Sequence, residues 1–125
     1  MSRTKHITFL FLLLLAAGQI LAQNYRTGSK KAIKRFEEAR ACFEIRDDAC
    51  VEEALQKAIQ ADPAFVEAYQ LMAQVKFDKG ETEQAIVYYS RSLELDPGGN
   101  PDGYRLLAGL TMRVGDYGKT LELIE

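Results

Sequence analysis

The chain has 125 residues, enough for one domain, with a formal net charge of −2 and a single histidine, His6. This slightly acidic balance argues against a nucleic-acid-binding surface, which is normally basic. Removal of an N-terminal leader containing His6, Arg3 and Lys5 would leave 18 acidic and 14 basic residues and no histidine. Such a chain lacks the usual agent of general acid–base chemistry and metal binding. We therefore predict no enzyme activity, no cofactor, no metal site and no small-molecule substrate.

Residues 1–22 have the pattern of a secretory signal peptide. A short basic start precedes an uncharged, largely apolar run over residues 7–17, which is too short for a comfortable bilayer span. The best cleavage bond is Ala22-Gln23, a second candidate follows Gly18, and an uncleaved membrane anchor is the alternative. The sequence thus predicts export to the periplasm or outer membrane, or secretion. The polar residues 23–29 are predicted to form a flexible lead-in.

Residues 64–97 form the clearest repeat unit. Small and bulky residues alternate at spacings of three and four, the helical period, on both sides of a break at Gly80. Asp96-Pro97 closes the unit, and Asp62-Pro63 precedes it by 34 residues. Gly115 follows Gly80 by 35 residues. A single helix pair cannot bury its apolar face alone, so this unit predicts neighbouring copies of itself.

A period of 34 with helix, turn, helix and a closing proline resembles the tetratricopeptide repeat (TPR) family. The residues of the unit that match the family pattern are Tyr69, Met72, Ala73, Gly80, Ala85, Tyr89, Ser92 and Pro97. Lys76 departs from the pattern, because the family usually has an aromatic residue there. The resemblance implies an all-α fold, a TPR-like right-handed α-solenoid of about three helix-turn-helix pairs.

The flanking units are less regular. Residues 30–63 have Arg35 and Glu38 where the family has an aromatic residue and a leucine, and we interpret them as a degenerate capping pair. A plain helical hairpin outside the array is the alternative. Residues 101–125 repeat the pattern with Thr120 in place of the usual alanine. They stop at Glu125, about seven residues before their own Asp-Pro, so we expect a truncated third TPR and a longer natural protein.

Cys42 and Cys50 flank the first inter-helix turn, eight residues apart. A hairpin about Arg46 places them at facing ends of two antiparallel helices, and export permits oxidation. A disulfide is therefore one interpretation. Two small thiols that fill the core are the other.

In TPR proteins the first helix of each pair lines a concave groove, and the resemblance implies the same here. By position, the predicted partner-binding residues are Phe36, Arg40, Phe43, Glu44, Glu67, Gln70, Gln74, Phe77, Asp78, Arg105, Met112 and Arg113. Aromatic and methionine side chains among arginine and glutamine are typical of interface hot spots. The alternative is that the phenylalanines pack between repeats. The basic and amide residues that clamp a C-terminal carboxylate in some TPR adaptors have no match at the corresponding positions.

The leading functional prediction is an exported TPR scaffold or adaptor that binds a peptide or protein, and no nucleic acid, in its concave groove. A second prediction is the N-terminal docking region of a larger outer-membrane or peptidoglycan-associated protein in a cell-envelope assembly. A leader followed by a degenerate helix pair and better repeats resembles the N-terminal TPR region of Bacteroidetes envelope proteins. A third is the scaffold part of an enzyme whose chemistry lies beyond Glu125.

Overall fold

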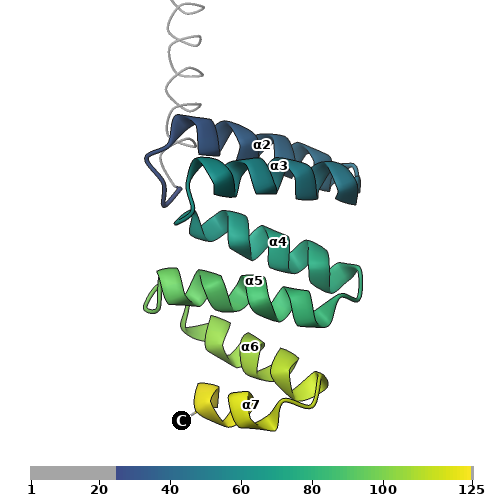
Figure 1. Ribbon diagram of the computed structural model, residues 1–125, viewed down its shortest axis with the longest axis vertical. Helices are drawn as coiled ribbons and strands as arrows, with labels where there is room; N and C mark the ends of the chain where they lie inside the picture. Colours follow the sequence, from purple (N-terminus) through teal and green to yellow (C-terminus); the bar gives the residue numbers. More distant parts are fainter. Residues whose placement is uncertain (1–24, 125) are drawn as a thin grey trace, which may run out of the picture.

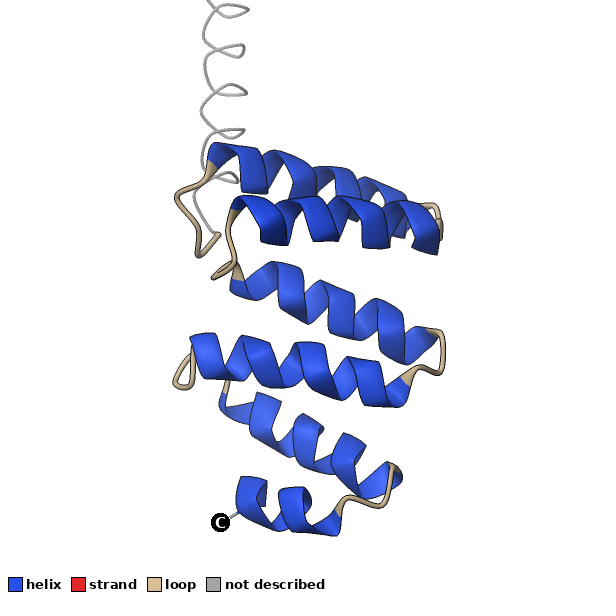
Figure 2. Ribbon diagram, in the orientation of Figure 1, coloured by secondary structure: helices blue, strands red, loops and turns tan. Residues whose placement is uncertain are grey.

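The computed structural model describes residues 25–124, and all regular structure within them is helical. The six helices are α2 (Lys30–Glu44), α3 (Asp48–Ala61), α4 (Val66–Asp78), α5 (Thr82–Leu95), α6 (Pro101–Arg113) and α7 (Tyr117–Ile124). Each helix packs against the next one along the chain, so the helices stack in chain order (Figure 1) with short loops between them (Figure 2). The predicted all-α solenoid of three helix pairs is confirmed. The predicted leader, residues 1–22, lies outside the described residues.

The three turns within the pairs share one backbone geometry. Arg46, Gly80 and Gly115 hold equivalent positions and have φ of 56°, 78° and 81°. At the second turn, the Gly80 N–H bonds the Phe77 carbonyl at 2.9 Å and the next N–H bonds the Lys76 carbonyl at 2.8 Å. This is the Schellman arrangement, which closes a helix through one residue in the left-handed region. The first turn keeps this geometry even though an arginine occupies the position that glycine favours.

Side-chain caps fix where four of the helices begin. Ser29, Asp47, Asn100 and Asp116 each accept a hydrogen bond from the backbone N–H three residues later, at 3.1, 3.1, 3.2 and 3.1 Å respectively. Each cap satisfies an N–H that has no partner inside the helix. Short polar residues at these points therefore set the boundaries between successive helices.

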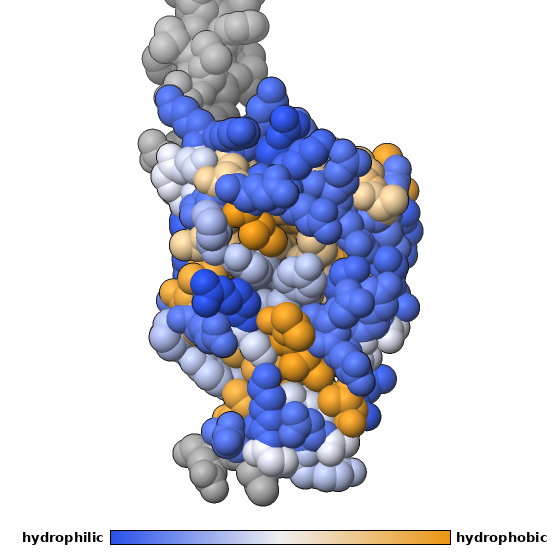
Figure 3. Space-filling view, in the orientation of Figure 1, coloured by the Kyte–Doolittle hydropathy of each residue, from blue (hydrophilic) through white to orange (hydrophobic). Residues whose placement is uncertain are grey.

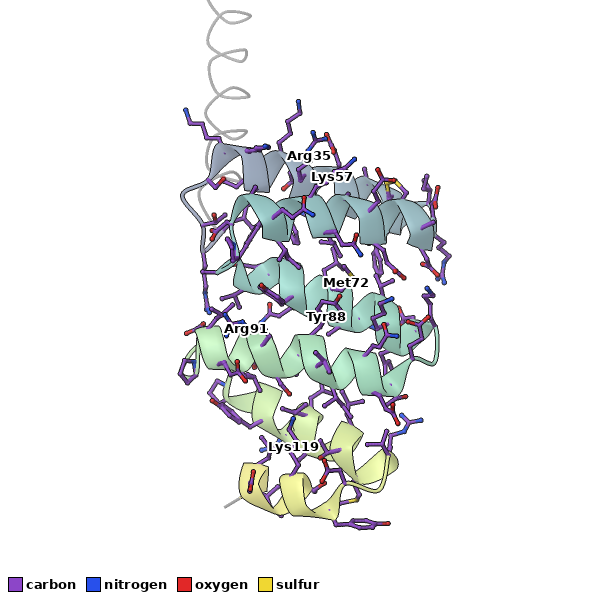
Figure 4. The ribbon with its side chains drawn as sticks, viewed as in Figure 1. Arg35, Lys57, Met72, Tyr88, Arg91 and Lys119 are labelled. Carbon is purple, nitrogen blue, oxygen red and sulfur yellow. A yellow bond between two sulfur atoms is a disulfide. The ribbon has the colours of Figure 1, made fainter. Side chains whose placement is uncertain are left out.

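The core consists of small residues on the first helices and bulky residues around them. Ala39, Ala73 and Ala108 hold equivalent positions and are all buried. One buried cluster lies between α2, α3 and α4, and a second lies between α4, α5 and α6. Tyr88 packs against both clusters. Met72 on α4 and Tyr88 on α5 come from neighbouring helices at the centre of the stack (Figure 4). The residues 64–97 unit thus joins the two clusters.

The segment before α2 is held against the first helix pair. The Tyr25 ring packs edge-on against Phe36 and Phe65, with centroids 5.1 and 5.9 Å away. The Thr27 hydroxyl donates to the Asp62 carboxylate at the end of α3. The flexible lead-in that the sequence predicts covers residues 23–29, and Tyr25 and Thr27 within it make these contacts. The polar residues 23–29 show no periodic pattern, but the fold leaves an apolar surface between α2 and α4 that one aromatic ring can cover.

Two charged residues of the degenerate first pair form an ion pair at the surface. Arg35 and Glu38 lie one turn apart on α2, with 2.9 Å between Nη1 and Oε2, and both side chains are partly exposed. Arg35 is on the outer side of the stack (Figure 4). Since no described helix covers this side of α2, charged residues can stand where an internal repeat has apolar ones.

Lys76 joins a charge network instead of packing as an aromatic residue. Its side chain is nearly buried, and Nζ lies 2.9 Å from Glu52 on α3 and 3.0 Å from Glu81. Lys79 contacts the same two carboxylates at 2.7 and 3.2 Å. Burial alone would lower the pKa of Lys76, but its hydrogen bonds to Glu52 and Glu81 outweigh that effect and raise it. The hydrogen bond from Lys79, followed by that from Lys76, lowers the pKa of Glu52. The network therefore ties the first pair to the second.

Thr120 replaces the usual alanine in the third pair, and its buried hydroxyl is hydrogen-bonded there. Its hydroxyl lies 2.7 Å from the hydroxyl of Thr111, and both residues are buried between α6 and α7. Thr111 also donates to the Ala108 carbonyl at 3.0 Å. A buried hydroxyl is tolerated when it is hydrogen-bonded, so the two threonines compensate each other.

Candidate partner-binding groove

The first helix of each pair, that is α2, α4 and α6, contributes residues to two hollows on the surface. The N-terminal hollow, about 490 Å³, lies between α2 and α4 and is lined by Tyr25, Phe36, Arg40, Phe43, Glu44, Glu67, Gln70, Leu71 and Gln74. The C-terminal notch, about 110 Å³, is lined by Gln70, Ala73, Gln74, Phe77, Tyr89, Leu106 and Leu110. Gln70 and Gln74 lie one turn apart on α4 and line both. The hollows therefore form one groove that crosses α4.

The N-terminal hollow has an aromatic floor and a polar rim. Phe36 is buried beneath it, whereas the Tyr25 hydroxyl lies at its edge. That hydroxyl accepts from Arg40 Nη1 at 3.0 Å and donates to Glu37. Partial burial raises the pKa of Tyr25, as does its hydrogen bond to Glu37. Arg40, the only cation among the described residues that line this hollow, is thus already engaged with groups of the chain itself.

Glu67 is placed in the same hollow by the first turn of α4. Its Oε1 accepts from the backbone N–H of Arg26 at 3.0 Å. Its Oε2 is shielded from solvent and has no hydrogen-bond partner among the described residues. Glu44, at the end of α2, adds a second carboxylate to the lining. The charge left free in this half of the groove is negative.

The C-terminal notch is apolar, and none of the described residues that line it is charged. Ala73 and Leu110 are buried at its base, while Leu106 and Phe77 are 53% and 36% exposed. The Arg113 guanidinium lies 5.5 Å from the Phe77 ring centroid, a cation–π contact that holds this ring. One face of the molecule is mostly polar over the first pair, and apolar side chains gather over the middle of the stack (Figure 3).

The structure brings together part of the predicted groove set. The predicted residues that line the hollows are Phe36, Arg40, Phe43, Glu44, Glu67, Gln70, Gln74 and Phe77. Phe36 is buried and Phe43 packs against the core, so these two rings contribute floor rather than exposed contact. Asp78 accepts from Gln74 at 2.7 Å and so orients one of the central amides.

Of the three predicted α6 residues, Arg113 contacts Phe77 at the notch, whereas the other two lie away from both hollows. Arg105 is highly exposed and pairs with Asp102 at 3.7 Å, and it lines neither hollow. Met112 is 56% exposed and also lines neither. Met112 holds the position in the third pair that Phe77 holds in the second. Phe77 faces the next pair, at α6, but residues 25–124 contain no fourth pair that Met112 could face. Leu106 and Leu110 instead form the α6 wall.

Sequence reasoning missed those two leucines. Leu106 lies one repeat, 35 residues, after Leu71, and both face back toward the preceding first helix. Comparing equivalent positions across repeats could have found this wall. Tyr25 was missed as well, and no repeat pattern marks it, because it precedes the array.

A disulfide joins Cys42 and Cys50, whose Cα atoms are 5.8 Å apart. It lies at the turn end of α2 and α3, where Figure 4 shows it in yellow. The structure therefore agrees with the interpretation of these cysteines as a disulfide and not as two free thiols. The bond links the two helices on either side of Arg46, the residue in the left-handed turn position.

Residues 25–124 contain no group of three or more His, Cys, Asp or Glu side chains placed to hold a metal ion. Within the same range no helix has the length and apolar character needed to cross a membrane.

The fold and groove define a repeat protein of the helical-hairpin class. A family profile described as tetratricopeptide repeat matches residues 46–110, more than half of the chain. The chain therefore belongs to the tetratricopeptide repeat family. No curated protein matches it.

Solved TPR structures share this fold at low sequence identity. The crystal structure of MamA protein matches with a TM-score of 0.67 and 22% identity over 78% of this chain and 52% of that one, so the chain spans about half of it. The TPR2B domain of yeast Sti1 in complex with pHsp70 matches with a TM-score of 0.64 and 23% identity, over 76% and 75%. The second TPR of RPAP3, bound to HSP90 peptide SRMEEVD, matches with 0.66 and 16% identity, over 77% and 88%.

Proposed function

We propose that this protein is an exported, non-enzymatic interaction module that holds a peptide or protein segment in the groove of α2, α4 and α6. The observation that carries the proposal is the continuity of the N-terminal hollow and the C-terminal notch through Gln70 and Gln74. Two TPR domains of the same fold were solved in complex with pHsp70 and with an HSP90 peptide, which supports a groove that binds protein.

The mechanism is rigid presentation of a preformed surface. The walls of the groove belong to helices fixed by the core, so little ordering of the module is needed on binding. Each glutamine amide can both donate and accept, which suits the backbone of an extended segment. Phe77 and Leu106 supply apolar area beside those amides.

Export and an envelope role are part of the same proposal. The signal-peptide pattern of residues 1–22 supports export, and the disulfide between Cys42 and Cys50 fits an oxidising compartment. The module then acts as a docking or spacing element within an envelope assembly. N-terminal sequencing of the mature protein from fractionated cells tests this, with Gln23 expected as the first residue. A protein that keeps Met1 and stays in the cytosol contradicts export.

The groove proposal is tested by site-specific photo-crosslinking in the native host. A photoreactive residue replacing Gln74 is expected to crosslink a discrete partner, whereas one replacing Gln60 on α3, also exposed, is not.

Two triple variants with similar changes then compare the faces. Replacing Gln70, Gln74 and Phe77 with alanine is expected to abolish capture by a crosslinker placed at Glu44 in the groove. The matched variant Gln56→Ala, Gln60→Ala, Val87→Ala changes exposed positions that line neither hollow and should leave capture intact. Equal capture by both triple variants refutes the groove proposal.

A further inference from the structure

We propose that the groove selects a peptide segment that carries one apolar side chain for the C-terminal notch and one basic side chain for the N-terminal hollow. This inference rests on the proposed function and names the chemistry of the partner. The two halves of the groove differ in charge and polarity, and each half constrains one position of the ligand.

The notch selects an apolar side chain. Its volume, about 110 Å³, is of the size that accepts one small apolar group, and its described lining carries no charge. Ala73 is buried at its base and leaves the room that a larger residue would fill. Leu106 and Phe77 stand partly exposed at its sides. An aliphatic side chain placed here loses its hydration and gains contacts on several sides, which is expected to strengthen binding about ten-fold or more.

The N-terminal hollow selects a positive charge. Glu44 and Glu67 line it, and Oε2 of Glu67 is shielded from solvent without a described hydrogen-bond partner. Arg40 is the single cation among the described residues of the lining, and it is engaged by the Tyr25 hydroxyl at 3.0 Å and by Glu37 at 3.7 Å. A lysine or arginine of the partner can pair with these two carboxylates. An acidic segment would meet a lining in which the carboxylates of Glu44 and Glu67 outnumber the guanidinium of Arg40.

The central amides connect the two requirements. Gln70 and Gln74 line both halves, so a segment that fills the notch and the hollow must pass over them. The Gln74 amide nitrogen already donates to Asp78 at 2.7 Å, which leaves its carbonyl oxygen oriented and able to accept a backbone N–H of the segment. Apolar and basic side chains on one extended strand satisfy the whole groove.

A random dodecamer display library screened against the full chain tests the inference. Peptides with one leucine, isoleucine or methionine and a lysine or arginine at a fixed separation are expected to be enriched. Fluorescence anisotropy of a selected peptide then measures affinity, which should fall as salt is raised because ion pairs are screened.

Variants assign each half of the ligand. Glu67→Gln is expected to weaken the selected peptide about five-fold but to leave the same peptide with lysine changed to glutamine unaffected. Leu106→Gln should weaken both peptides about equally. Val87→Gln, an exposed apolar change on α5 that lines neither hollow, is the matched control and should change neither affinity.

The outcomes separate the two proposals. Enrichment of acidic peptides, or equal loss for both peptides in Glu67→Gln, overturns the ligand chemistry while binding in the groove stands. Selected peptides that bind the groove triple variant as well as the wild type overturn the groove itself. A screen that enriches no sequence overturns both.

Discussion

The left-handed turn position gives a prediction in which one energetic term is isolated. Gly80 has φ of 78°, and a Cβ added there would meet no atom within 4 Å. Gly80→Ala therefore changes no packing, and its effect comes from the backbone. An L-residue in the left-handed region costs about 1–2 kcal/mol. Lower entropy of the unfolded chain returns about 0.4–1 kcal/mol. The expected net loss of stability is about 1 kcal/mol, or a decrease in Tm of about 4–8 °C for a domain of this size.

Urea denaturation followed by circular dichroism measures this change, with the slope against urea expected to stay constant. Gly98→Ala is the matched control, since its Cβ also meets nothing within 4 Å and its φ is outside the left-handed region. That substitution should be neutral or slightly stabilising. Equal stabilities of the Gly80→Ala and Gly98→Ala proteins would refute the assignment of the cost to the turn geometry.

The reverse change tests the same argument in the first turn. Arg46 has φ of 56° in the equivalent position, so Arg46→Gly relieves the unfavourable backbone while adding unfolded-state entropy. The expected result is a gain of up to about 1 kcal/mol. Because the disulfide links the helices on both sides of this turn, the measurement is made without reductant. A clear loss of stability would show that the arginine side chain contributes more than the left-handed backbone costs.

Three further predictions concern packing, oxidation and pH. Gly109→Ala should stabilise the protein by about 0.5–1 kcal/mol, because the added Cβ lies in open space on helix α6. Gly103→Ala places a Cβ 2.8 Å from a leucine methyl carbon, so in urea denaturation this variant should be less stable than Gly109→Ala by at least about 1 kcal/mol. Reducing the disulfide, which closes a short loop, should cost about 2.5 kcal/mol on the loop-entropy relation, measured by melting with and without dithiothreitol. Glu52 has its pKa lowered in the folded state, so its contribution is present above its unfolded pKa and is lost as pH falls through the folded value. Glu52→Gln should therefore lower stability at pH 7 by about 1–2 kcal/mol, and this loss should shrink as pH falls through the folded pKa of Glu52. A loss that stays constant across an acid titration would contradict the ion-pair explanation.

Much of the groove was within reach of the sequence, because the repeat period fixes which helix positions face the same side. Gln70, Gln74 and Phe77 follow from that register, and they line the groove. The repeat period does not show which residues of the first helix in one pair face the first helix of the neighbouring pair. Arg105 and Met112 match groove positions by count, yet the wall of α6 that faces α4 carries Leu106 and Leu110 instead.

Local pattern was sufficient for the helices, the turns at Gly80 and Gly115 and the order of the pairs, because helical period and turn chemistry depend on residues close in sequence. Contacts between distant residues required the tertiary structure. The buried charge of Lys76, at a position where an aromatic residue is usual, is paired with Glu52 on α3. The two residues are 24 positions apart in sequence, and their charged atoms lie 2.9 Å apart. Tyr25 lies outside the repeats, and only the apolar surface assembled by α2 and α4 gives it a place beside Phe36. The charge of the N-terminal hollow was likewise decided by tertiary contacts, because Tyr25 engages Arg40 and Oε2 of Glu67 has no hydrogen-bond partner among the described residues.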